Sequence, residues 1–451
     1  MRKLTEGNIS KQIVLFALPI LIGVSLQRIY VLVDTMMVGR LLGAKELSAV
    51  GAASSISIMF IELCNSLTSG FSIIIAQFFG AEDDKNLKKA LAGTYVLSAI
   101  FGVLFTVIGF VLINPLLTWT KVPLELFYES SVYLKALILG LIASLIYNLM
   151  ANLLRSVGDS TMPLVFLIIS VVLNIFLDYF FIAIIHKGVM GAAIATVISQ
   201  AVAGLSCVVF CIFKRKLLSV SFKDFIVDIS VYKLLLSQGF AMALMLSIVS
   251  VSTVILQTGI NSLGTELIAG YTAGRKYLEL LMMPGASLAM TAASYSSQNF
   301  GAKKFDRIEE GVNKMYIIGF IWSFIATIIV FILGKFMITT ITGNNVSDEI
   351  INNGVLYLRI SILLFCPLMV LSITRSTLQG MNHKKTPLIS SSIEFLVKIL
   401  AVVFFVPKLG FLGVCITEPL IWVLGALCIY PLYKNLFKKS KTEYLKQSMQ
   451  C

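Results

Sequence analysis

The stretch Gln77-Phe78-Phe79-Gly80-Ala81 is repeated, with one difference in five residues, 221 positions later as Gln298-Asn299-Phe300-Gly301-Ala302. Other landmarks recur in the same order in each half. They are Arg155-Ser156, Gly158, Pro163-Leu164 and Gly188-x-x-Gly191 in the first, and Arg375-Ser376, Gly380, Pro387-Leu388 and Gly410-x-x-Gly413 in the second. The chain therefore consists of two copies of one half, both running in the same direction.

The composition indicates that the solvent of both halves is lipid. Hydrophobic residues make up 58% of the chain and charged residues only 13%, and the mean hydropathy is +0.92, which leaves too little polar surface for a soluble protein of this size. A bilayer crossing needs roughly 20 apolar residues. Twelve runs fit, six in each half: 13–38, 47–68, 91–113, 131–154, 162–184, 190–213, 234–258, 267–298, 314–334, 354–378, 387–406 and 411–433.

These runs predict an all-α integral membrane protein with two six-helix bundles related by a pseudo-two-fold repeat. The bundles are expected over 1–216 and 234–451, joined by a cytoplasmic connector over 217–233. The first run is too long for a secretory signal, so we interpret it as a retained helix. Duplicated halves of this kind are typical of secondary transporters, which bind their substrate between the halves.

The basic residues predict the orientation. If the N-terminus is cytoplasmic, 24 of the 36 Lys and Arg residues fall in or beside cytoplasmic loops, including the cluster Lys214-Arg215-Lys216 and the basic C-terminal tail. The positive-inside rule then places both termini in the cytoplasm, and we expect a multi-pass protein of the cell membrane. The net charge of +13 is thereby explained by topology and lipid headgroups, and no nucleic-acid partner is expected.

Other classes of function fit the sequence less well. The chain has no Walker motif, no evident nucleophile or phosphate-binding motif, and only two histidines, so neither an enzyme nor a structural metal site is expected. The basic-aspartate signature of major-facilitator transporters is missing from 80–90. A channel or scaffold without coupled exchange is disfavoured by the repeat and by the polar residues described next.

Four oxygen-bearing side chains lie at similar depths in the first half. Asp34 is four residues from the outer end of its run, about 6 Å deep, while Asp178 and Thr196 are each six residues from theirs, about 9 Å deep. Asn174 precedes Asp178 by one turn, on the same face. Two carboxyl groups, an amide carbonyl and a hydroxyl suit a proton or Na⁺. For Asp34 alone, a helix cap or an interfacial lysine pair is an equal alternative, and the other three residues favour the ion site.

Several segments resemble MATE, the multidrug and toxic compound extrusion family. The opening helix from Pro19 through Val33-Asp34-Thr35 to Gly43, the stretch 153–163, and the helices carrying Asn174, Asp178 and Thr196 are similar to family segments. The resemblance covers essentially the whole chain. It implies export of amphiphilic, often cationic compounds in exchange for H⁺ or Na⁺, by alternating access of two six-helix bundles.

The resemblance is to the prokaryotic, DinF-like branch, and it implies roles for individual residues. The cation-coupling residues of that branch correspond to Asp34, Asn174, Asp178 and Thr196. Pro19 corresponds to a position where the first helix bends, although a membrane proline is also accommodated without motion. No cofactor is implied beyond the coupling ion. We expect H⁺ with Na⁺ competing, and a monomer whose partners are membrane lipid and small substrates.

Charged residues elsewhere in the spans are secondary candidates for coupling or for the substrate pocket. Arg28 and Glu62 fall at similar depth on sequential helices, so we expect them to pair, either as structural contacts or as part of a pocket. In the second half Glu279 and Glu394 are candidate ion ligands, although an ion pair of Glu394 with Lys398 at i,i+4 is the simpler expectation. Arg28 and Arg275 also keep open a flippase for lipid-linked saccharides or cell-wall precursors.

Overall fold

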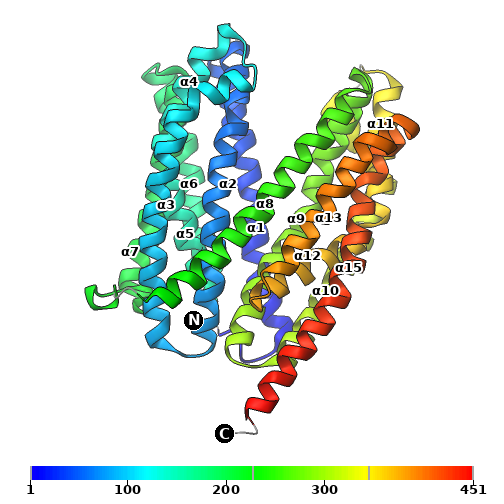
Figure 1. The fold of residues 1–451 in the computed structure, drawn as a ribbon. Coiled ribbons are helices and arrows are strands. Elements are labelled where there is room, and N and C mark those ends of the chain that lie inside the picture. The colour runs from blue at the N-terminus through cyan, green and yellow to red at the C-terminus, as the bar shows by residue number, and fades with distance from the viewer. Residues whose placement is uncertain (1–2, 226–227, 344–345, 449–451) are drawn as a thin grey trace. The chain divides into compact units, whose positions relative to one another are not determined.

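The protein is built from helices. The computed structural model describes residues 3–225, 228–343 and 346–448, and within these ranges every regular element is helical (Figure 1). Long apolar runs favour this structure because hydrocarbon offers no hydrogen bonds, so backbone N–H and C=O groups are satisfied inside each helix. The expected all-α membrane fold is confirmed.

In the described part of the chain, nine helical segments are long and apolar enough to cross a bilayer. They are α1 (Ile9–Leu41), α2 (Ala44–Gly80), α3 (Asp84–Trp119), α6 (Thr161–Tyr179) with η1 (Phe180–Ile184), α7 (Gly188–Lys214), α8 (Ile229–Asn261), α10 (Phe305–Thr342), α13 (Lys385–Leu400) with η4 (Ala401–Phe405) and α14 (Val406–Leu409), and α15 (Phe411–Ser448).

Two further crossings are bent pairs of helices. The first joins α4 (Leu124–Leu139) and α5 (Leu141–Ser156) at 45°, and the second joins α11 (Asp348–Leu363) and α12 (Phe365–Gly380) at 55°. The first bend lies at Gly140, where an added Cβ would overlap the side chain of Val197 on α7. Close helix packing therefore requires a glycine at this position.

The remaining long helix, α9 (Thr265–Gly301), has 37 residues and is less apolar. It carries Arg275, Lys276 and Glu279 within its span. Together with α9, the crossings described above account for the twelve segments expected from the sequence. Two short 3₁₀ turns, η2 (Lys216–Leu218) and η3 (Phe222–Asp224), lie in the segment that joins the halves.

The internal repeat is visible in the positions of the helices. Both ends of α2 recur 221 positions later as the ends of α9. The two π-helical segments, η1 and η4, are five residues long and are separated by the same 221 positions. Gly43 and Gly264 precede α2 and α9 with φ of 107° and 98°, values that favour glycine. The two halves are therefore copies in structure as well as in sequence.

The helices form two compact units. The first is built mainly from Ile22–Ala243, and the second from Leu4–Leu21 with Leu244–Cys451. The boundaries of these units differ from those of the expected bundles, because α1 and α8 are each divided between the two units. The start of α1 belongs to the second unit, and the start of α8 belongs to the first.

Specific contacts explain this division. In the second unit the Ser287 hydroxyl donates to the Ala17 carbonyl at 2.7 Å, and the Gln298 side chain accepts a hydrogen bond from the Leu4 backbone at 3.0 Å. In the first unit Gly70 of α2 and Gly239 of α8 approach so closely that an added Cβ on Gly70 would lie 2.6 Å from the Gly239 Cα. The N-terminal segment and the start of α8 are thus anchored by packing and hydrogen bonds.

Candidate cation-coupling site

The four residues singled out in the first half come together in the first unit. Asp34 comes from α1, Asn174 and Asp178 come from the last two turns of α6, and Thr196 comes from α7. Asn174 and Asp178 are 1% and 0% exposed, whereas Asp34 and Thr196 are partly buried. The i,i+4 spacing on α6 directs both of its polar side chains inward among otherwise apolar neighbours.

Hydrogen bonds join these side chains. When the Asn174 carboxamide is oriented to satisfy its neighbours, its nitrogen donates to Asp178 Oδ2 at 2.9 Å and its oxygen accepts from the Thr196 backbone N–H at 3.2 Å. The carboxyl groups of Asp34 and Asp178 lie within hydrogen-bonding range of each other. Two carboxyl groups form such a bond only when one of them carries a proton, because an ionised carboxylate has no donor.

The carboxyl pair also has unused acceptors. Among the described residues, the Oδ1 atom of Asp34 and that of Asp178 are buried without a hydrogen-bond partner. Buried polar atoms in native proteins are almost always satisfied, so an orphaned pair of carboxyl oxygens indicates a place for a proton, a water molecule or a cation. Neither carboxyl group forms an ion pair with a basic residue of the described ranges. No cationic side chain of the described residues therefore compensates a negative charge on this pair.

Two tyrosines complete the cluster and were not identified from the sequence. The Tyr30 hydroxyl donates to Thr196 Oγ1 at 3.2 Å, and Tyr133 of α4, 6% exposed, lies close enough to Asp34 and Asp178 to interact electrostatically. Tyr30 precedes Asp34 by one turn, so its spacing was a usable signal. Tyr133 has no such local signal, because only the packing of α4 brings it to the cluster.

The backbone widens immediately after this cluster. The π-helical segment η1 begins at Phe180, two residues after Asp178. In the second unit η4 begins at Ala401, three residues after Lys398. Single π-helical turns are rare and are frequently found at functional sites. Both halves place this feature next to a buried ionisable side chain.

The expected pair of Arg28 and Glu62 is not formed. In the part of the chain that the structure describes, no ion pair within 4.0 Å involves either residue, and both side chains are exposed. Equal depth along two helices does not fix the direction in which each side chain points around its helix. The pairing hypothesis was therefore wrong, although either residue alone remains a pocket candidate.

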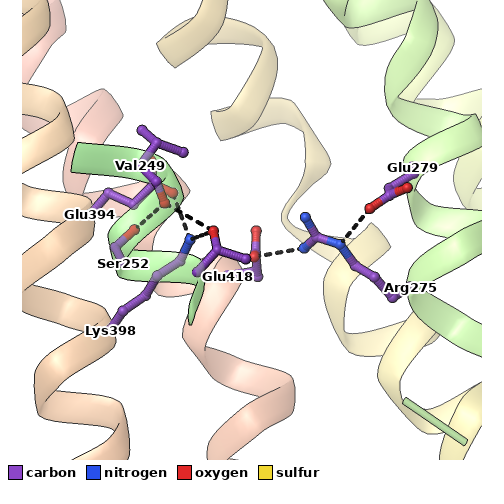
Figure 2. A network of polar contacts seen from close by, with 8 residues as sticks. Val249, Ser252, Arg275, Glu279, Glu394, Lys398 and Glu418 are labelled. Carbon is purple, nitrogen blue, oxygen red and sulfur yellow. Dashed lines mark hydrogen bonds and ion pairs between the residues drawn. The ribbon is translucent and has the colours of Figure 1, made fainter. Parts of the chain in front are cut away.

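The second unit contains a separate network of charged residues (Figure 2). Lys398, 2% exposed, contacts Glu394 at 2.7 Å and the Thr253 hydroxyl at 3.0 Å, which confirms the expected intrahelical pair. Arg275 contacts Glu418 of α15 at 2.7 Å and Glu279 at 3.2 Å. Glu279 and Glu394, the secondary ion candidates, each already have a cationic partner.

Glu418 was not predicted as a candidate residue from the sequence, although it is a lone carboxylate within an apolar run. The side chain is 7% exposed and is held between the elements that carry Arg275 and Lys398. A buried charge usually persists where it is paired or lines a pathway. That rule, applied to residues 411–433 as it was to the first half, would have identified Glu418.

Pro19 lies within α1, and the helix continues through it. The helix passes from the second unit to the first between Leu21 and Ile22, two residues after Pro19. A proline inside a helix removes one backbone hydrogen bond and weakens the helix locally. The position is therefore suited to a bend that leaves Asp34 in one unit and the start of the helix in the other.

The duplicated membrane fold and an uncompensated buried carboxyl pair define a membrane transporter. The MatE family model matches the chain twice, over residues 19–180 and 241–404. The chain belongs to the MatE family, the family of MATE multidrug efflux transporters, and is a multi-pass membrane protein.

Relatives and solved structures agree with this assignment. The chain is 28% identical to the probable multidrug resistance protein YpnP of Bacillus subtilis over 334 residues, covering 74% of this chain and 75% of YpnP. It is 25% identical to YoeA of the same organism, also a probable multidrug resistance protein, covering 99% and 98% of the two chains. An outward-facing multidrug resistance MATE transporter has the same fold, with a TM-score of 0.89, 24% identity, and coverage of 97% of this chain and 98% of that one.

Proposed function

We propose that the chain is a secondary active antiporter that exports amphiphilic, often cationic compounds in exchange for H⁺, with Na⁺ competing for the same site. The observation that supports this most is the pair Asp34 and Asp178, whose carboxyl groups face each other within hydrogen-bonding range. Each keeps one buried oxygen without a partner among the described residues. The relatives YpnP and YoeA are probable multidrug resistance proteins, which favours this substrate class.

The proposed cycle uses the carboxyl pair as the place where the coupling ion is held. A single proton is shared between Asp34 and Asp178 while the site is dry, and Asn174 holds Asp178 in position through its amide. When water reaches the site, the ionised form is stabilised and the proton leaves. Binding of the proton and binding of the substrate favour opposite access states, so that inward movement of the ion drives outward movement of the compound.

We further propose that both termini are cytoplasmic, that the protein acts in the cell membrane as a monomer, and that it needs no cofactor apart from the coupling ion. The distribution of basic residues supports the orientation. The flippase alternative relied on Arg28 and Arg275, and Arg275 is now accounted for by Glu279 and Glu418. An antiporter of small compounds therefore remains the better proposal.

The test is movement of a fluorescent cationic dye in everted membrane vesicles under an imposed pH gradient and then a Na⁺ gradient. We expect wild-type transport to follow the pH gradient. Asp34→Asn keeps the shape but removes the ionisable group, so the gradient-driven rate should fall at least about tenfold. Glu125→Gln is the matched control, because Glu125 is an exposed carboxylate of the same unit, and it should transport normally.

Two results would overturn this proposal. Dye movement that ignores both gradients in wild type and Asp34→Asn alike would exclude coupling at Asp34. Absence of dye movement in any protein, with the chain folded in the membrane, would redirect the search to lipid-linked substrates. Transport driven by Na⁺ alone and lost in Asp34→Asn would keep the site and change the ion.

A further inference from the structure

The first unit contains a cavity of about 480 Å³, and neither member of the carboxyl pair lines it. It lies between α3, α5 and α7 and the segment that contains η2. Most of its lining is aliphatic, and three lining side chains, Val103, Ile142 and Ile212, are 55%, 39% and 51% exposed. The cavity therefore opens onto the exposed apolar surface of the helices, where lipid chains reach it.

The depth of the cavity corresponds to one leaflet of a bilayer. On α3 the lining runs from Tyr95 to Val103 and on α5 from Ile142 to Met150. Measured from the connector-side ends of the spans, at 91 and 154, these residues lie about 6 to 18 Å deep at 1.5 Å per residue. Half of a hydrocarbon core is about 15 Å thick. An acyl chain of the connector-side leaflet has the length and polarity to fill this space.

A fixed wall closes the connector-side end of the cavity. Leu218, Ser219 and Val220 line it, and the Tyr95 hydroxyl donates to the Leu218 carbonyl at 2.9 Å. The Lys88 ammonium group donates to the backbone carbonyls of Lys216 at 3.1 Å, Leu217 at 2.9 Å, and Ser219. Four hydrogen bonds from two side chains hold this turn in place, so the connector-side end of the cavity has a defined shape.

Two polar features of the cavity point to a lipid with an anionic headgroup. The Ser98 hydroxyl lines the cavity, is 3% exposed, and has no partner among the described residues. This makes it available as a donor to an ester carbonyl. Lys214 and Lys216 adjoin the wall, are exposed, and form no ion pair with any described residue, whereas Arg215 between them pairs with Asp159 at 2.7 Å. Free lysines at a membrane surface attract anionic headgroups.

We infer that this cavity binds an anionic phospholipid of the connector-side leaflet, with an acyl chain between α3, α5 and α7 and the headgroup at Lys214 and Lys216. The bound lipid fastens the segment that joins the two halves to the first unit. The site is separate from the carboxyl pair and uses none of its residues, so its test does not depend on the proposed coupling.

The experiment places the purified full chain in nanodiscs containing phosphatidylglycerol with a photoreactive acyl chain, or the phosphatidylcholine analogue as the control, and maps cross-linked peptides by mass spectrometry. We expect labelling within 95–103, 142–150 and 208–220, several-fold stronger with phosphatidylglycerol. Ala99→Phe puts a ring into the cavity from an exposed lining position and should abolish this labelling. Val111→Phe, on α3 at an exposed position outside the lining, should not.

A second pair of variants tests whether the lysine charges, and not the packing of the cavity, determine the preference for the anionic lipid. Lys214→Gln with Lys216→Gln should reduce phosphatidylglycerol labelling to the phosphatidylcholine level. Lys438→Gln with Lys439→Gln, at exposed positions of α15, should leave the preference for phosphatidylglycerol intact. Equal labelling by both lipids, or labelling unchanged in Ala99→Phe, would overturn the inference. Displacement of the probe by a transported dye would assign the cavity to substrate instead. If Ala99→Phe fails to fold, the wild-type peptide map and the lysine variants decide the question.

Discussion

At the residue scale, the carboxyl groups within the spans of the two units differ in how their charge is compensated. In the second unit Glu418, Glu394 and Glu279 each contact Arg275 or Lys398. In the first unit Asp34 and Asp178 face each other, and no basic residue of the described ranges pairs with them. A carboxylate that already has a cationic partner is stabilised by that partner. A carboxyl pair without one is stabilised by binding a mobile cation. This contrast supports the proposal that coupling takes place in the first unit and that the charged residues of the second unit stabilise its structure.

If the ion pairs of Arg275 stabilise the second unit, loss of Arg275 should lower the stability of the folded protein. Breaking a buried ion pair leaves one charge uncompensated and costs about 3–5 kcal/mol in comparable cases, whereas replacing both partners by apolar residues is often tolerated. Arg275→Met should therefore lower the melting temperature of the purified protein by several degrees, and adding Glu418→Met should restore most of the loss.

The control for this prediction is Lys276→Met, which removes an exposed neighbouring charge that forms no ion pair within the described ranges. It should leave the melting temperature unchanged. A double variant as unstable as Arg275→Met alone would contradict the structural role and would point to a function for Glu418 itself.

At the scale of the helices, α1 is the element that connects the candidate site to both units. Its first part is fixed in the second unit, where Ala17 accepts a hydrogen bond from Ser287. Its later part carries Tyr30 and Asp34 in the first unit. We expect any relative motion of the units to bend α1, and Pro19 lies two residues before the point where α1 passes from one unit to the other. Loss of one backbone hydrogen bond makes that position the easiest to bend.

The bending role predicts that Pro19→Ala lowers transport without lowering stability. Alanine restores the missing N–H and raises helix propensity, so the variant should be at least as stable as wild type. Its rate of dye transport should fall several-fold under the same imposed gradient, because a straighter α1 favours one access state. Both quantities are measured on one preparation, by thermal unfolding and by vesicle transport.

Pro115→Ala is the matched control, since Pro115 also lies inside a long helix, α3, but within one unit. We expect it to transport at the wild-type rate. Equal transport by Pro19→Ala and wild type would show that Pro19 is accommodated without taking part in motion.

For the whole molecule, sequence periodicity and the repeat were enough to predict the all-α fold, the twelve segments and the four polar residues of the candidate site. Those features follow from local rules, namely run length, depth along a helix and i,i+4 spacing. Tyr133 and the Arg275–Glu418 contact depend on how helices distant in the sequence pack, which local rules do not give. The expected Arg28–Glu62 pair failed for the same reason, because depth was known and side-chain direction was not.

The sequence also did not predict that α1 and α8 would each be divided between the two units. The boundaries of the repeat show where each copy begins in the sequence. Contacts such as the close approach of Gly70 and Gly239 determine which unit a helix segment packs into. As a result the expected connector at 217–233 precedes the point, between Ala243 and Leu244, where the chain leaves the first unit. Duplication thus sets the order of the helices, and packing sets their grouping.

We propose that the carboxyl pair of Asp34 and Asp178 carries the ion whose movement drives export. The most direct test is proton movement driven by a dye gradient in proteoliposomes that contain an internal pH indicator, for wild type, Asp34→Asn, Asp178→Asn and the control Glu125→Gln. We predict a dye-dependent pH change in wild type and Glu125→Gln, and none in either aspartate variant. A dye-dependent pH change that persists in both Asp34→Asn and Asp178→Asn would show that the carboxyl pair does not carry the coupling ion.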